Sequence, residues 1–506
     1  MATSIDAQAP AATPAQLQSV RGALTSPRRL KTEVLGGLVV ALALIPEAIA
    51  FSIIAGVDPR IGLFASFTMA VTIAFVGGRP AMISATTGAV ALVIAPLVKS
   101  HGLDYLVAAV ILAGIFQIVL GLSGVAKLMR FIPRPVMVGF VNALAILIFL
   151  SQVPELIGVP WLVYPLTALG LLVVFGLPRL TKAVPAPLVA IVAMTLITVT
   201  AAVVVPTVGD KGALPDSLPS LSLPNVPFTL ETLQVIFPFA LAMAFVGLLE
   251  SLMTAKLVDD ITDTRSAKTR EAWGQGVANI VTGLFGGMGG CAMIGQTMIN
   301  VKASGARTRI STLLAGVFLL ILVVALGDIV SLIPMAALVA VMIFVSVATF
   351  DWHSIRPATL KALPKSEAAV MAATVVVTVA THNLATGVGV GVLVAMVLFA
   401  RRVAHFVTVE RTVTEHDGGR ATYRVDGELF FASANDLYTQ FEYALDPDCV
   451  VIDMRDSHLW DTSTIAALDA ITEKYRQHGK SVDVVGLNQA SALMRERLAG
   501  KLGAGN

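Results

Sequence analysis

The chain has 506 residues, of which 56% are hydrophobic and 13% are charged, and its mean hydropathy is +0.82. Soluble proteins carry about 25% charged residues, so this composition excludes an ordinary soluble enzyme. The 35 Lys and Arg residues nearly balance the 33 Asp and Glu residues, which leaves no excess charge for binding nucleic acid. The two cysteines offer neither a disulfide framework nor a metal-binding pair, and we expect no metal or other cofactor.

Fourteen apolar helical segments are predicted after a polar, then basic N-terminal segment, which we expect to stay uncleaved in the cytoplasm. They are 34–56, 62–77, 86–99, 105–125, 136–154, 161–177, 186–205, 235–257, 269–286, 294–302, 309–330, 335–349, 367–381 and 385–402. With this count, 22 Lys and Arg residues fall in cytoplasmic segments and three, Arg60, Lys99 and Lys211, fall outside. Because basic residues concentrate on the cytoplasmic side, the count predicts a multi-pass protein of the plasma (inner) membrane with both termini in the cytoplasm.

The predicted fold is an all-α membrane domain of fourteen transmembrane segments in a 7+7 inverted repeat, followed by a small α/β domain. The predicted parts are a cytoplasmic segment at 1–30, a first membrane repeat at 31–205, an extracellular linker at 206–233, a second membrane repeat at 234–404 and a cytoplasmic domain at 405–500. In the last part we expect strands at 421–425, 429–431, 450–454 and 482–485, and helices at 435–445, 464–478 and 490–498.

Two of the fourteen segments, 86–99 and 294–302, are too short to span the hydrocarbon core, which takes about 20 helical residues. Each is the third of seven, and each follows a stretch rich in Gly, Thr or Ser. Interrupted segments at corresponding places of two halves indicate inverted repeats with a binding site near mid-membrane. A weaker match between residues 41–47 and 244–250, each ending in a carboxylate, agrees with this repeat.

A helix that begins at mid-membrane points unpaired N–H groups and the positive end of its dipole at whatever precedes it. Two such helix starts that converge would bind an anion. The glycines at these starts also have a simpler explanation, since small residues let membrane helices pack closely. The residues at the two starts are Thr86, Thr87 and Gly88, and Gly295, Gln296 and Thr297.

Glu47 and Glu250 are the ionisable residues that lie well inside the predicted hydrocarbon layer. A charge there is costly unless it faces water or protein, so a functional role is expected. The alternative is a protonated side chain that only hydrogen-bonds between helices. A carboxyl group that exchanges a proton at such a place is what proton coupling requires. Thr254, one helical turn after Glu250, would lie on the same face and add a hydroxyl group to the pocket.

The stretch Asp461–Thr464 precedes the predicted helix 464–478 in the C-terminal domain. Thr462 or Ser463 is expected to be the N-cap of this helix. Ser463 is also a candidate regulatory phosphosite, because a phosphate group is electrostatically tolerated at a helix N-terminus.

The stretches Leu44–Phe51, Gly247–Leu252 and Asn300–Arg309 resemble the SulP anion transporters, the sulfate permease family. The C-terminal domain, with its Asp461–Thr464 loop, resembles the STAS domain of that family. This resemblance, which covers nearly the whole chain, implies a core and a gate domain, an elevator-like movement and a homodimer. It also implies anion or coupling-ion contacts from the matching positions Glu47, Phe51, Gly88, Ala89, Glu250, Thr254, Gly295, Gln296 and Thr297.

Many members of the family carry Gln where this chain has Glu47 and Arg where it has Gln296, so the pocket here is less positive. The difference disfavours simple chloride or bicarbonate exchange. It favours proton-coupled symport of a small anion such as sulfate, bicarbonate or a dicarboxylate like fumarate. The expected partners are therefore this anion, a proton, the lipid bilayer, a second copy of the chain and a cytoplasmic partner of the STAS domain.

Other functions stay open. Within the transporter class these are anion exchange and sodium coupling, the latter through Glu250 and Thr254. Outside it they are an anion channel, a membrane-anchored regulatory scaffold and a proton-coupled nucleobase permease. Ring stacking in the permease would need aromatic side chains near the half-helices, and Phe51 is the one candidate.

Overall fold

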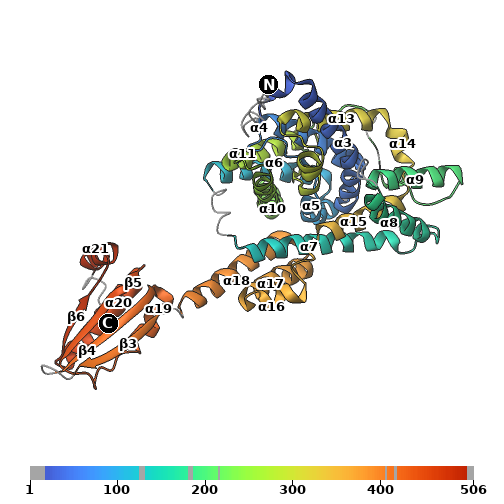
Figure 1. Cartoon of the computed structure of the whole chain (residues 1–506). Helices are drawn as coiled ribbons and strands as arrows, with labels where there is room; N and C mark the ends of the chain where they lie inside the picture. The colour runs from blue at the N-terminus through green and yellow to red at the C-terminus, as the bar shows by residue number, and fades with distance from the viewer. Residues whose placement is uncertain are drawn as a thin grey trace, which may run out of the picture. The chain divides into compact units, whose positions relative to one another are not determined.

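The structure, a computed structural model, describes residues 18–124, 132–180, 186–212, 214, 217–404, 407–414 and 419–498. The predicted N-terminal segment up to residue 17, and the predicted cytoplasmic residues Lys127, Arg130 and Lys182, lie outside these ranges. The chain divides into two compact units, Met1–Val392 and Leu393–Asn506. Figure 1 shows the elements of both units in chain order.

The first unit is helical, and each of the fourteen predicted segments coincides with a helix or half-helix. The helices are α2 (Val20–Leu24), α3 (Pro27–Ala55), α4 (Pro59–Val76), α5 (Gly88–His101), α6 (Leu103–Leu122), α7 (Arg134–Gln152), α8 (Val163–Leu180), α9 (Ala186–Thr200), α10 (Leu230–Thr262), α11 (Lys268–Leu284), α12 (Ile294–Met298), α13 (Arg309–Ala325), α14 (Gly327–Ser331), α15 (Met335–Thr349), α16 (Pro357–Ala362), α17 (Lys365–Thr381) and α18 (Leu384–Ala404), the last of which enters the second unit. Shorter helical turns are η2 (Val153–Leu156), η3 (Gly209–Lys211) and a π-helix, η4 (Ile299–Ala303), that continues α12. Within the described ranges, seven helices are long and apolar enough to cross a membrane. The count of fourteen passages and the inverted repeat stay predictions.

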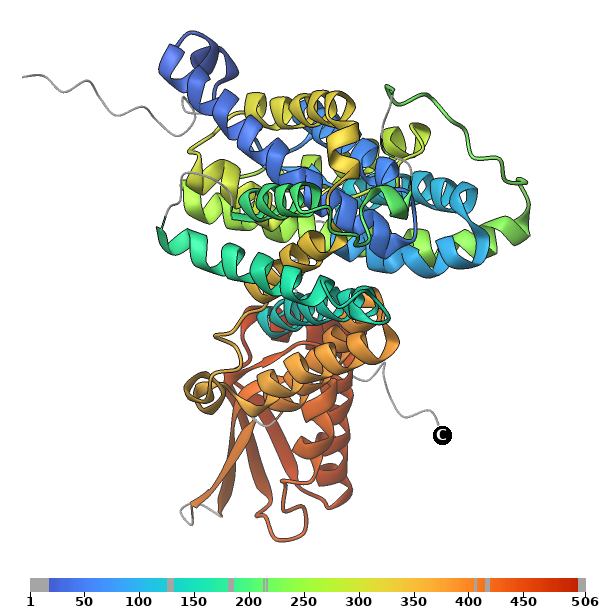
Figure 2. The ribbon, with the colours of Figure 1, turned by 90° about the vertical axis from the view of Figure 1, so that its right-hand side faces the viewer.

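Helix α3 runs through the middle of the first unit, where it is blue in Figure 2. Pro27 opens it at a position where the missing N–H costs nothing, and Gly56 ends it with a φ of 78°. Helices α4, α5, α13 and α15 pack against it. Pro46 lies inside the helix and has no N–H, so the carbonyl of Leu42 loses its helical hydrogen bond directly beside Glu47.

Two short strands meet inside this helical unit. β1 (Ser84–Ala85) pairs antiparallel with β2 (Cys291–Ala292). A Cβ atom on Gly290 would lie 2.1 Å from the carbonyl oxygen of Ala85, so the close approach requires glycine. Helix α5 begins three residues after β1, and α12 begins two residues after β2. Because antiparallel strands run in opposite directions, both helix N-termini lie beside this strand crossing and the two helices leave it in opposite directions.

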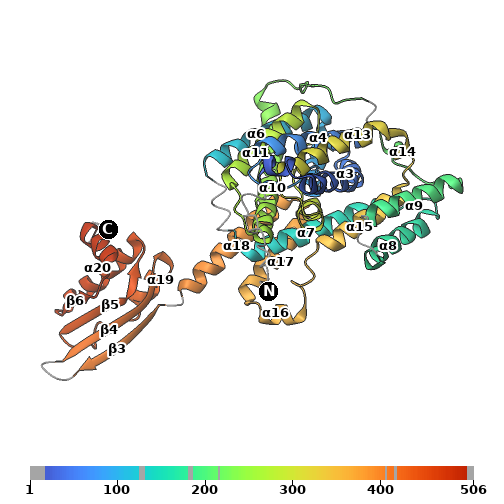
Figure 3. The same cartoon turned by 45° about the horizontal axis from the view of Figure 1, so that its top comes forward.

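The second unit carries a four-stranded sheet in the order β3-β4-β5-β6. Its elements are β3 (Thr408–Thr414), β4 (Arg420–Leu429), α19 (Phe431–Tyr438), β5 (Cys449–Leu459), α20 (Thr462–Gln477), β6 (Ser481–Val485) and α21 (Gln489–Leu498). β3 and β4 are antiparallel, whereas the β4–β5 and β5–β6 pairs are parallel. Alternate residues of β4 and β5 are buried, and α20 lies along one face of the sheet in Figure 3.

The predicted α/β character of this unit is confirmed, but two elements differ from expectation. β3 was not predicted, and the predicted strand at 429–431 is wrong because β4 continues to Leu429 and Phe431 already belongs to α19. The predicted helix at 435–445 correspondingly starts earlier and ends at Tyr438. The apolar run here is typical of a strand, but the Phe430 N–H donates to Ser433 Oγ at 3.0 Å and the chain turns into a helix.

A buried carboxylate holds the second unit together. Asp446 Oδ2 accepts hydrogen bonds from the hydroxyls of Tyr423 and Tyr475 at 2.6 and 2.5 Å, and Oδ1 lies 2.7 Å from Arg411 Nη2. Buried charges are tolerated when they are paired in this way. Burial, with the bond to Asp446, raises the pKa of the Tyr423 and Tyr475 hydroxyls.

These raised pKa values predict how stability depends on alkaline pH. The folded state holds the tyrosine protons more tightly than the unfolded state, in which the pKa is about 10. The free energy of unfolding should therefore be constant up to about pH 10 and fall as the pH rises further. Alkaline titration of the full chain, followed by circular dichroism and tyrosinate absorbance, measures this. Tyr475→Phe should make the fall shallower, whereas Tyr164→Phe in the first unit should not; equal slopes for wild type and Tyr475→Phe would contradict the account.

Candidate functional site

Glu250 lies in α10 and is buried, with 7% of its surface exposed. The thiol of Cys291 in β2 donates a hydrogen bond to Glu250 Oε2 across 2.9 Å. Cys291 Sγ also lies 3.1 Å from Thr87 Oγ1. Either of these two groups can be the donor in this hydrogen bond, and the Thr87 side chain also interacts with the carboxyl group of Glu250. Glu250 is thereby linked to β2 through Cys291 and to Thr87, the residue before α5.

Thr87 has a second role, because its hydroxyl oxygen accepts the Val90 N–H at 3.3 Å and so caps α5. A Thr at the N-cap satisfies one of the N–H groups that a helix start leaves unpaired. The N-terminus of α5 is therefore built into the same hydrogen-bonded chain as the Glu250 carboxyl group.

Glu47 lies in α3 and keeps partial exposure. Its carboxyl group interacts with the side chain of Gln296, which is 2% exposed in the first turn of α12. The structure thus brings the two predicted carboxyl groups to the two half-helices: Glu47 to α12, and Glu250 to the start of α5.

Two glycines show how crowded the start of each half-helix is. A Cβ atom on Gly88, the first residue of α5, would lie 2.9 Å from Phe51 Cε1, so the ring of Phe51 covers the start of this helix. A Cβ atom on Gly295 would meet nothing within 4 Å. Open space therefore lies beside the first turn of α12, close to the residue that interacts with Glu47.

Four other predicted site residues serve the frame around this space. Thr86 Oγ1 donates to the Gly62 carbonyl at 3.0 Å, and Thr297 Oγ1 accepts the Ile83 N–H at 3.0 Å. Thr254 Oγ1 donates to the backbone carbonyl of Glu250 at 2.8 Å, so its proton is not directed at the carboxyl group. Ala89 is fully buried in α5.

Sequence reasoning missed several buried polar groups that fix the crossing. Asn279 in α11 donates to Gln117 Oε1 at 2.9 Å, and its Oδ1 accepts the Gly290 N–H at 2.9 Å. Glu33 accepts three N–H groups at the start of α13, and Glu271 accepts the N–H groups of residues 78 and 79. Polar residues within apolar segments were the available signal, but their partners lie far away in the chain.

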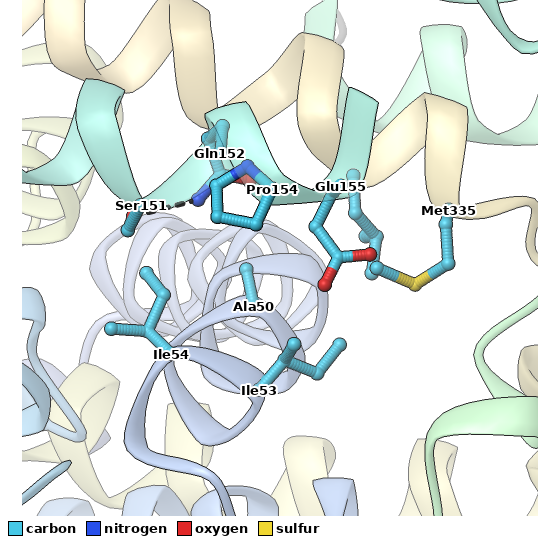
Figure 4. Close-up of a pocket in the computed structure, with 9 residues that line it drawn as sticks. Ala50, Ile53, Ile54, Ser151, Gln152, Pro154, Glu155 and Met335 are labelled. Carbon is cyan, nitrogen blue, oxygen red and sulfur yellow. Dashed lines mark hydrogen bonds between the residues drawn. The ribbon is translucent and has the colours of Figure 1, made fainter. Parts of the chain in front are cut away.

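A cavity of about 220 Å³ lies next to the site, between α3 on one side and η2 and α15 on the other (Figure 4). Ile53, Gln152 and Met335 are among its lining residues, which include none of the predicted site residues. At its rim, Glu155 forms a 2.7 Å ion pair with Lys211. Ala50, which lies one helical turn after Glu47 in α3, lines this cavity.

In the second unit, the N-cap of α20 is Asp461, whose Oδ1 accepts the Thr464 N–H at 3.1 Å. The prediction of Thr462 or Ser463 as the N-cap is wrong, because both residues already lie in the first turn of the helix. Ser463 is exposed there, and its role as a phosphosite stays a prediction.

Two solved structures share the fold of this chain. A structure of murine Solute Carrier 26 family member A9, described as an anion transporter in the inward-facing state, matches with a TM-score of 0.81 over 98% of this chain and 92% of that chain, at 16% identity. The transmembrane domain of the cyanobacterial bicarbonate transporter BicA matches with a TM-score of 0.63 over 71% of this chain and 98% of that chain, at 26% identity. The first unit therefore has the fold of these two transporters.

Sequence comparison gives the family. Residues 30–165 and 160–374 match the sulfate permease family, and residues 411–498 match the STAS domain. The chain belongs to the sulfate permease family, which confirms the resemblance seen in its sequence. "Putative sulfate transporter YbaR" of Bacillus subtilis (strain 168) is 53% identical over 470 residues, which are 93% of this chain and 97% of that protein. Bicarbonate transporter BicA of Synechocystis is 28% identical over 524 residues, which are 93% of this chain and 91% of that protein. The family and the relatives in sequence are membrane transporters, so the protein is not an enzyme.

The link between Glu250 and Cys291 predicts a stability effect. Cys291→Ala removes the donor and leaves a buried carboxyl group without this partner, which should cost about 1–3 kcal/mol. Cys291→Ser keeps a donor at the same place and should cost less. Thermal unfolding of the purified chain in detergent measures both changes; equal midpoints for the two variants would show that the hydrogen bond does not stabilise the fold.

Proposed function

We propose that the protein is a secondary active transporter of small anions, which bind between the N-termini of α5 and α12. The observation that carries the proposal is the pairing of β1 with β2, which brings two helix starts and two carboxyl groups to one place. N–H groups and dipoles at helix starts favour an anion. Sulfate, bicarbonate and a dicarboxylate such as fumarate are the candidate substrates, and relatives named as sulfate and bicarbonate transporters support the first two.

The two carboxyl groups support coupling to protons. An ionised Glu47 would repel an anion in the open space beside Gly295, whereas a protonated Glu47 would donate a hydrogen bond to it. Gln296, which interacts with Glu47, is neutral and does not offset that charge. If Glu47 or Glu250 takes up a proton before the anion enters, the proton and the anion would cross the membrane together, which is symport.

The packing of the helices supports an elevator-like movement. Helices α3, α4, α5, α10 and the strand crossing carry the site, while η2 and α15 face α3 across the cavity near Ala50. We propose that the first group is the core domain and that α7, α8, α15 and α17 belong to the gate domain. Sliding of the core along the gate would then expose the site to one side of the membrane at a time.

The proposed setting is a homodimer in the plasma (inner) membrane with both termini in the cytoplasm, where the STAS domain would meet a partner. Sodium coupling through Glu250 and Thr254 and anion exchange are the nearest alternatives within this class. A third alternative is an anion channel, which would work without a carboxyl group that exchanges protons.

Uptake of labelled sulfate, bicarbonate and fumarate into proteoliposomes tests the proposal. An inward proton gradient should drive accumulation of at least one of them by the wild type. Glu250→Gln removes the exchangeable proton but keeps an oxygen that can accept the Cys291 hydrogen bond, so uptake should no longer respond to the proton gradient. Glu231→Gln, an exposed position in the first turn of the same helix, should behave like the wild type.

The same assay separates the alternatives. Uptake that follows a sodium gradient instead would favour sodium coupling. Uptake that never exceeds the equilibrium concentration under either gradient would favour a channel or exchanger and would contradict the proposed symport.

A further inference from the structure

The segment between α15 and α17 forms a rigid surface with no function assigned above. It contains the short helix α16, which Figure 3 shows at the end of the connection between those two helices. Asn142 of α7 accepts the Asp351 N–H at 2.8 Å and donates to Ser354 Oγ at 2.9 Å. Because Asn142 is buried, these bonds fix the start of the segment to the helices of the first unit.

Three large apolar side chains of this segment are exposed. They are Trp352, Ile355 and Leu360, with exposures of 52%, 44% and 41%. The Trp352 indole N–H donates to the Val347 carbonyl at 2.8 Å, and its ring contacts the Phe350 ring at a tilt of 49° with centroids 4.8 Å apart. The ring is therefore held in place with much of its surface uncovered, directly after a helix of the membrane domain.

Three basic side chains share the segment with this apolar surface. Arg356 precedes α16, Lys361 lies in its last turn, and Lys365 begins α17. All three are exposed, and within the described ranges none forms an ion pair.

The two carboxylates of the segment do not balance these cations locally. Asp351 Oδ1 accepts the N–H groups of His353 and Ser354 at 3.0 and 3.3 Å. Glu367 lies in the first turn of α17, where the helix dipole favours a negative charge.

Several other basic residues of the first unit have partners within the protein. Arg79 donates to Asp259 and two threonines, and Arg309 donates to backbone carbonyls at the end of α4. Arg356, Lys361 and Lys365, by contrast, are exposed and form no ion pair within the described ranges, so they are available to an external anion.

We propose that this α16 surface, defined as Trp352, Ile355, Arg356, Leu360, Lys361 and Lys365, binds anionic phospholipids. The basic groups contact the phosphate headgroups, and the three apolar side chains enter the boundary with the acyl chains. The inference rests on the proposed fourteen-segment topology, in which α15 and α17 cross the membrane and the segment between them lies at the membrane surface. Tryptophan and basic residues are enriched at that boundary, and unpaired cations attract anionic headgroups within a Debye length.

Fluorescence quenching in nanodiscs tests this assignment on the full chain. The lipid is zwitterionic phosphatidylcholine with a rising fraction of phosphatidylglycerol that carries bromine on its acyl chains. The difference in emission between wild type and Trp352→Phe isolates the signal of Trp352. We expect half-maximal quenching at a low mole fraction of the anionic lipid, and weaker quenching when the bromine is on phosphatidylcholine.

The charge-removing variant Arg356→Gln/Lys361→Gln/Lys365→Gln should move half-maximal quenching to a mole fraction at least about fivefold higher, since each basic group at an anionic surface contributes about that factor. Arg60→Gln/Lys99→Gln, which removes two exposed cations elsewhere on the first unit, should match the wild type. A conservative variant with Arg356→Lys should also match it, and thermal unfolding checks that every variant is folded.

Two results would overturn the proposal. Equal quenching by brominated phosphatidylcholine and phosphatidylglycerol would show contact without selection for anionic lipid. An absence of quenching by either lipid would show that something else, such as a second copy of the chain, covers the surface.

Discussion

The antiparallel pairing of β1 with β2 is the interaction on which the rest of the structure depends. Within a membrane domain there is no water to hydrogen-bond the backbone, so each non-helical N–H and C=O group needs a partner in the protein. The two strands supply these partners to each other, and the Met293 N–H extends the pairing to the Ile83 carbonyl at 2.9 Å. Side chains also bond to backbone groups of the strands that the pairing leaves free: Ser251 Oγ accepts the Ala292 N–H at 3.0 Å.

This pairing also explains where the candidate site lies. Helices that start beside the crossing present their N-termini there, and the Gly-rich approach to β2 keeps the backbones close enough to pair. Glu250 is connected to the crossing through Cys291. Glu47 lies in α3 directly after Pro46, where one helical hydrogen bond is missing. Two carboxyl groups in different surroundings, one held by a thiol and one beside open space, suit a site that binds an anion and a proton in turn.

Much of this arrangement could be predicted from the sequence. The interrupted segments before residues 88 and 294 were visible because Gly, Thr and Ser replace apolar residues there, and the positions of Glu47 and Glu250 within apolar helices followed from the hydrophobic runs around them. The pairing of the strands was not predictable, because two-residue strands leave no alternation pattern.

Contacts between residues that lie far apart in the chain could not be predicted from the sequence either. Thr86 and Thr297 look like ligands in the sequence, yet each bonds to backbone groups of a neighbouring segment. In the second unit Asp461, Thr462 and Ser463 are all residue types that cap helices, and only the observed end of β5 and start of α20 assign the role to Asp461.

The most direct test of the central claim is an experimental structure of the full chain with selenate, a heavier analogue of sulfate, compared with one without it. The account predicts density for the anion between the N-termini of α5 and α12, beside Gly295 and bounded by Phe51, Glu47 and Glu250. Selenate density in the cavity lined by Gln152 and Met335 instead, with none at the strand crossing, would contradict it.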